Sequence, residues 1–151
     1  MSFRELTITV LAKRFISSFE SSDLVKWSIE ILKLGVESTS LDILAGLDHE
    51  NTLVREKYFF KILDHFDFKI DSKDLLLKEY AFYISKKFLH KILNQDTSLS
   101  TMYTIHSELD SKSDLEIFYK ICIDLEILED TGYSLYTNLT LDNKDEFIYK
   151  R

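Results

Sequence analysis

The amino-acid sequence predicts an all-α protein, a bundle of about seven helices joined by short connections. The 151 residues include no proline and only three glycines, so the residues that turn-rich and all-β folds require are scarce. Apolar residues instead recur at the spacing of amphipathic helices along most of the chain. With this length and 45% hydrophobic residues, we expect one helical domain that spans residues 1–151 and folds on its own.

The first four predicted helices are separated by polar segments. Apolar periodicity predicts a helix over 3–19 and a second over 23–34, which Gly35 ends in a left-handed conformation. A serine- and threonine-rich segment is expected to cap a short helix over 41–47, and a fourth helix is predicted over 52–66.

The second half of the chain is predicted to contain a long helix and two shorter ones. Residues 72–94 are apolar around nearly the whole circumference, which is typical of a central helix. A sixth helix contains Leu99 to Leu109, and Ser113 with Glu116 forms a capping box that opens a seventh over 114–130. The tail over 131–151 is expected to be less regular and packed on the bundle.

HEAT-like or TPR-like stacking of the helices is the alternative to a globular bundle, although no matching repeat period is found in the sequence.

The charge distribution favours a protein partner over a nucleic acid. The net charge is −7, and the segment 96–130 alone carries −7, while 51–95 carries +3. An acidic surface repels phosphates and attracts cationic proteins. We therefore expect a cationic protein partner and no direct nucleic-acid contact.

The sequence contains no pattern of residues that predicts catalysis, a cofactor or a metal site. The four histidines fall in separate predicted elements: His49, His65, His90 and His106. His65 lies near Asp64 and Asp67, but neighbouring phenylalanines favour a helix end with solvated charges over a metal site. Cys122 is flanked by isoleucines and carboxylates, which favours a packing role over that of a nucleophile. We expect no enzyme activity, no metal and no cofactor.

The chain is expected to be a soluble cytoplasmic protein. It has no secretion signal and no apolar run long enough to span a membrane. A single cysteine fits a reducing compartment.

The predicted seventh helix contains the candidate binding surface. Ile123 and Ile127 lie one turn apart, with Tyr119 in the same row and carboxylates around them, as expected for apolar anchors within an acidic rim. The alternative is a helix buried on both sides. The residues predicted to bind the partner are Glu108, Asp110, Glu116, Tyr119, Ile123, Glu126, Ile127 and Asp130.

One further pattern resembles a known group of proteins. Trp27 is followed by a Leu-x-x-Gly helix end at Gly35, a serine-capped Leu-x-x-Leu-Ala-Gly-Leu over 41–47, and an aromatic-rich helix with Tyr58-Phe59-Phe60. The segment Tyr80-Ala81-x-Tyr83-Ile84 continues the match to about residue 93. This is similar to small helical bacterial immunity proteins, which neutralise contact-dependent or otherwise secreted antibacterial toxins. The matching positions concern packing and capping, with Gly46 expected to allow close approach of two helices. They carry over no partner-binding residues.

The resemblance and the acidic charge lead to one functional hypothesis. The resemblance implies an immunity protein, and complementary charge would speed its capture of a basic toxin such as a nuclease. The alternatives are a helical adaptor or scaffold, and an enzyme whose site is assembled from scattered residues.

Overall fold

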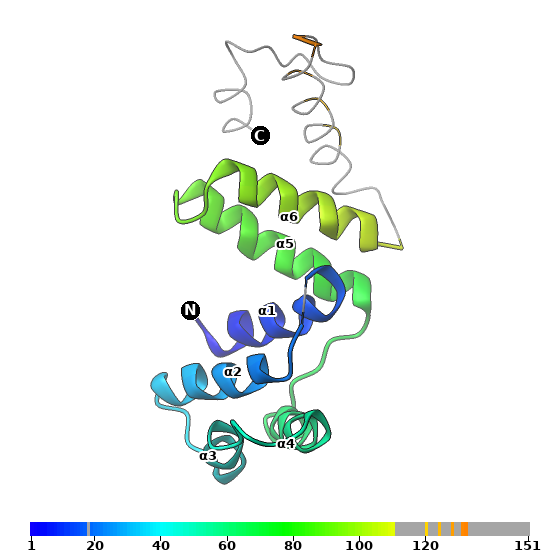
Figure 1. Ribbon diagram of the computed structural model, residues 1–151. Coiled ribbons are helices and arrows are strands. Elements are labelled where there is room, and N and C mark those ends of the chain that lie inside the picture. Colours follow the sequence, from blue (N-terminus) through cyan, green and yellow to red (C-terminus); the bar gives the residue numbers. More distant parts are fainter. Residues whose placement is uncertain (18, 111–119, 121–123, 125–127, 129–130, 133–151) are drawn as a thin grey trace. The chain divides into compact units, whose positions relative to one another are not determined.

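A computed structural model describes residues 1–17, 19–110, 120, 124, 128 and 131–132 (Figure 1). Within these residues the chain forms six α-helices and no strand, which confirms the all-α prediction. The chain divides into two compact units, Met1–Tyr80 and Ala81–Arg151. The expectation of a single domain stays a prediction. Among the described helices, none is long and apolar enough to cross a membrane.

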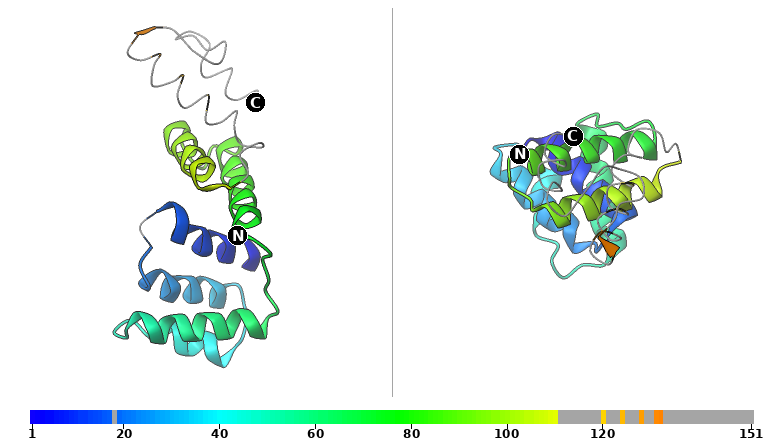
Figure 2. Two further views of the ribbon diagram at one scale, coloured as in Figure 1. Left: turned by 90° about the vertical axis from the view of Figure 1, so that its right-hand side faces the viewer. Right: turned by 90° about the horizontal axis from the view of Figure 1, so that it is seen from above.

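The first unit is built around α2. Its helices are α1 (Phe3–Ile16), α2 (Ser22–Lys33), α3 (Thr39–Ala45) and α4 (Thr52–His65). Helix α2 contacts each of the other three, and α3 also contacts α4. Figures 1 and 2 show α2 between α1 on one side and α3 and α4 on the other. The four short helices thus share one core.

Aromatic rings join α1, α2 and α4 in that core. Trp27 on α2 lies edge-on to Phe59 on α4, with 4.9 Å between ring centroids, and to Phe3 on α1, at 6.1 Å. The indole N–H donates a 3.1 Å hydrogen bond to the buried hydroxyl of Thr7. That hydroxyl in turn donates to the carbonyl of Phe3 at 2.7 Å. The one buried polar group of the tryptophan is therefore satisfied without water.

Polar side chains cap the beginnings of four described helices. Ser2, Asn51 and Asn94 accept hydrogen bonds from the backbone N–H groups of Glu5, Val54 and Thr97 at the beginnings of α1, α4 and α6 (Gln95–Glu108). Ser72 accepts a 3.1 Å bond from the N–H of Leu75 at the beginning of α5 (Lys73–Leu89). Each bond satisfies one of the first backbone N–H groups, which have no partner within the helix.

Three described helices end in a left-handed residue. Gly35 has φ 85°, which confirms the prediction made for it. Asp67 (φ 52°) and Lys91 (φ 57°) adopt the same region after α4 and α5, without the conformational freedom of glycine. The N–H of Phe68 reaches back to the carbonyl of Leu63 at 2.9 Å, as in a Schellman motif. The left-handed Lys91 ends α5 five residues before the predicted boundary.

Two expectations about packing are wrong. Gly46 was expected to allow close helix packing, but a Cβ there would meet only carbonyls of its own turn, at 3.6 Å and 3.9 Å. Helix α5 was expected to be central, but it is not buried on all sides. Its side chains Leu75, Phe82 and Leu89 are at least half exposed.

Candidate functional site

The predicted binding surface lies mostly outside the described residues. Glu108 ends α6 and is half-buried, and Asp110 follows it in an exposed position. The remaining six predicted residues are not among the described ones: Glu116, Tyr119, Ile123, Glu126, Ile127 and Asp130. Of their neighbours, Leu128 and Asp124 are buried. The surface around Ile123 and Ile127 stays a prediction.

A hollow of about 400 Å³ in the first unit is the candidate binding site that the structure adds. Leu11 comes from α1, three residues come from the last turns of α4, and the rest from the segment that follows α4. The lining residues are Leu11, Phe60, Leu63, Asp64, Asp67, Phe68, Lys69 and Ile70. We call this the α4 hollow. Its volume lies within the range of roughly 300–1,000 Å³ that is usual for small-ligand pockets.

The floor of the α4 hollow is apolar and its charges are exposed. Leu63 is 7% exposed, whereas Asp64, Asp67 and Lys69 are exposed to solvent. Asp67 and Lys69 form an ion pair of 3.1 Å with each other. In the described part of the chain no cationic group pairs with Asp64. The hollow thus offers an apolar floor beside one carboxylate that lacks a cation.

Phe60 is the exposed aromatic side chain of this hollow. It is 46% exposed, although it follows the fully buried Phe59 in the sequence. The guanidinium carbon of Arg14 lies 5.2 Å from its ring centroid, and an Arg14 Nη2 donates a 2.9 Å bond to Glu56. Glu56 precedes Phe60 by one helical turn, so α4 places a carboxylate and an aromatic ring around the same cation.

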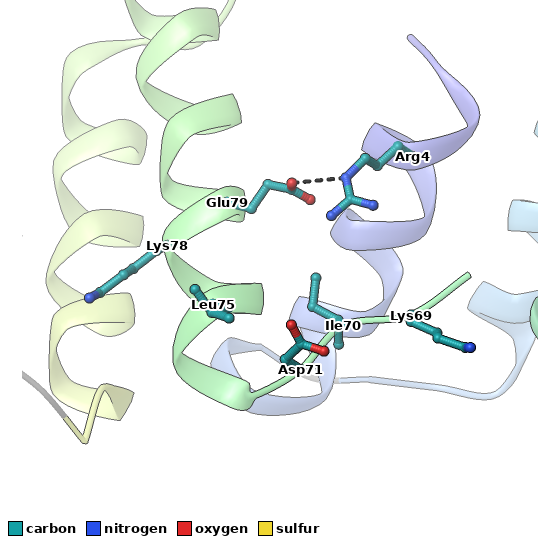
Figure 3. Close-up of a pocket in the computed structure, with 7 residues that line it drawn as sticks. All are labelled: Arg4, Lys69, Ile70, Asp71, Leu75, Lys78 and Glu79. Carbon is teal, nitrogen blue, oxygen red and sulfur yellow. Dashed lines mark hydrogen bonds and ion pairs between the residues drawn. The ribbon is translucent and has the colours of Figure 1, made fainter. Parts of the chain in front are cut away.

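A second hollow, of about 410 Å³, shares Lys69 and Ile70 with the first and is more polar. Figure 3 shows Arg4 and Glu79 joined across it by an ion pair of 2.9 Å, while Lys69 and Lys78 extend away from that pair. The second carboxylate oxygen of Glu79 is buried and accepts no hydrogen bond from the described residues. Because its main opposite charges already pair with each other, this hollow is the weaker candidate.

The titratable groups are arranged for packing and solvation. Among the described residues, no group of three histidine, cysteine or acidic side chains could hold a metal ion. His65, Asp64 and Asp67 are exposed at the end of α4, as predicted for a helix end with solvated charges. His106 is buried. Burial raises the pKa of the Tyr80 hydroxyl above its ordinary value, so this group stays protonated into the alkaline range. Tyr80 lines neither hollow.

Sequence reasoning missed the α4 hollow because three separate segments form it. The available signal was the row Glu56, Phe60 and Asp64, spaced four residues apart on a helix that already has Phe59 and Ile62 for its core. A large aromatic residue between two carboxylates is a sign of an exposed face rather than of a second core stripe.

Comparisons of the chain with known protein families, curated proteins and solved structures found no match.

Proposed function

We propose that this protein acts in the cytoplasm by binding a cationic protein, and that the partner is an antibacterial toxin which it neutralises. The α4 hollow is the observation that supports this best: an exposed aromatic ring, an apolar floor and an uncompensated carboxylate lie together. Buried apolar anchors give a complex its lifetime, and surrounding charge gives it its association rate.

The overall charge supports the same class of partner. A net charge of −7 attracts a basic protein and repels nucleic acid. An inhibitor needs only to cover its target, so binding alone is sufficient and no reaction has to be catalysed. A basic nuclease is the toxin class whose surface such an acidic chain complements most directly. The resemblance of residues 27 to about 93 to immunity proteins points to the same role.

Affinity capture followed by a growth assay tests this proposal. The full chain, carried on a resin, is incubated with lysate of the producing cells, and an unrelated acidic helical protein of equal net charge serves as the control. Bound proteins are identified by mass spectrometry and then expressed in a sensitive host, alone and together with this chain. We expect a basic protein that arrests growth alone and not in the presence of this chain.

A different result would favour the adaptor role. If capture returns only a housekeeping complex whose members do not impair growth, the toxin proposal is wrong and a helical scaffold replaces it. Enzymatic turnover by the purified chain that survives repurification would overturn the binding-only mechanism.

A further inference from the structure

Helix α4 presents a carboxylate on each side of one exposed ring. Glu56, Phe60 and Asp64 succeed one another at four-residue spacing and therefore lie in one row along the helix. Glu56 and the ring are both engaged by the chain's own Arg14, at 2.9 Å and 5.2 Å respectively. The first half of the row is thus an occupied arginine site within this protein.

The second half of the row has the same chemistry and is open. Phe60 and Asp64 both line the α4 hollow, whereas Arg14 and Glu56 do not. Among the described side chains, none pairs with Asp64. The hollow is also lined by apolar side chains from α1, α4 and the following segment: Leu11, Leu63, Phe68 and Ile70.

An arginine matches these surroundings better than other side chains do. Its long apolar stem packs along an apolar floor while its charged head stays at the rim. Its planar guanidinium is weakly hydrated, stacks on aromatic rings and pairs with carboxylates in a fixed geometry, whereas the ammonium of lysine is compact and strongly hydrated. A hollow of about 400 Å³ is large enough for one such side chain.

We propose that the α4 hollow receives an arginine side chain of the cationic protein partner, with its guanidinium between Phe60 and Asp64. This inference rests on the proposed function and specifies one anchor of that interaction. The residues that form this anchor are different from those of the predicted row Tyr119, Ile123 and Ile127.

Nuclear magnetic resonance titration of the ¹⁵N-labelled full chain tests the proposal, with N-acetyl-arginine amide as the probe. We expect saturable shifts of the backbone amides of Leu63, Asp64 and Phe68. N-acetyl-citrulline amide has nearly the same shape without the charge and should give no saturation. Equal binding of the citrulline probe would overturn the proposal. So would the absence of saturation with the arginine probe up to about 100 mM, a hundredfold weaker than a millimolar complex.

Matched variants locate the binding. Asp64→Asn should weaken the arginine probe by up to about fivefold, and Phe60→Leu by about threefold. The controls are Asp42→Asn, an exposed carboxylate on α3, and Phe82→Leu, an exposed aromatic residue on α5, neither of which lines the hollow. Asp64 is exposed, so its variant should fold normally. Unchanged affinity of Asp64→Asn for the probe contradicts the proposed position of the guanidinium.

The two proposals fail in different ways. If the arginine probe binds at the hollow but capture finds no toxin, the anchor stands and the function is wrong. If a toxin is captured and Asp64→Asn leaves both toxin and probe binding unchanged, the function stands and the anchor is wrong.

Discussion

Phe59 and Phe60 are neighbours on α4, yet they face opposite surroundings. Phe59 is fully buried and meets the Trp27 ring edge-on at 4.9 Å. Phe60 is 46% exposed, lies beside the Arg14 guanidinium and lines the α4 hollow. The two rings still touch edge-on, with 5.3 Å between their centroids. A step of about 100° around the helix is enough to separate a core face from a face that carries charge.

The comparison shows that one helix can divide folding and recognition between its faces. The core face joins α1, α2 and α4 through the buried rings of Trp27 and Phe59 and the partly buried ring of Phe3. The hollow face keeps an aromatic ring accessible and surrounds it with carboxylates, which contribute little to folding where solvent screens them. Substitutions on the core face should therefore reduce stability, and those on the hollow face should mainly reduce binding.

The largest expected effect separates the two phenylalanines. Phe59→Ala should lower the free energy of unfolding by about 3–5 kcal/mol, because it leaves a cavity among rings of three helices. Phe60→Ala should cost less than about 1 kcal/mol, because solvent already reaches that ring. Urea denaturation followed by circular dichroism measures both. Equal losses would show that Phe60 belongs to the core and that the comparison is mistaken.

A smaller loss of stability is expected on the core face when the Thr7 hydroxyl, which accepts the Trp27 hydrogen bond, is removed. Thr7→Val keeps the shape but removes the acceptor of the indole N–H, and should cost about 1–2 kcal/mol. Thr9→Val is the matched control, because its hydroxyl also donates to a carbonyl four residues back, at 2.7 Å, but accepts no indole bond. A double-mutant cycle with Trp27→Phe isolates the interaction energy between the Thr7 hydroxyl and the Trp27 indole. An interaction energy near zero would mean that the indole hydrogen bond does not stabilise the core.

The left-handed residue at the hollow should give a change of the opposite sign. Asp67→Gly should raise the free energy of unfolding by about 0.5–1 kcal/mol, because glycine adopts this backbone region without steric cost. Asp71→Gly, in the exposed segment without a positive φ, should instead lose a few tenths of a kcal/mol through the entropy of the unfolded chain. Thermal unfolding compares the two. A loss in both variants would mean that the Asp67 side chain stabilises the loop.

Local chemistry made much of the fold predictable, but the hollow depended on tertiary packing. The helical class, the first four helices and the left-handed Gly35 follow from periodicity and from the conformational freedom of glycine. The end of α5 was missed because Lys91 carries no sequence signal for a left-handed turn. The α4 hollow brings Leu11 together with residues more than forty positions later, and such a juxtaposition is not encoded in local spacing.

The smallest expected effect compares the carboxylates on either side of Phe60. Glu56→Gln should cost about 0.5 kcal/mol, because Glu56 pairs with Arg14 at a partly screened position. Asp64→Asn should change the free energy of unfolding by less than about 0.3 kcal/mol, because no described residue pairs with this carboxylate. Raising the salt concentration should shrink the Glu56 effect and leave that of Asp64 unchanged, since salt screens an existing attraction. Denaturation of both variants at low and high salt tests the difference. A loss at Asp64 as large and as salt-dependent as that at Glu56 would mean that the second half of the row already has a cation, leaving no place for an arginine from a partner.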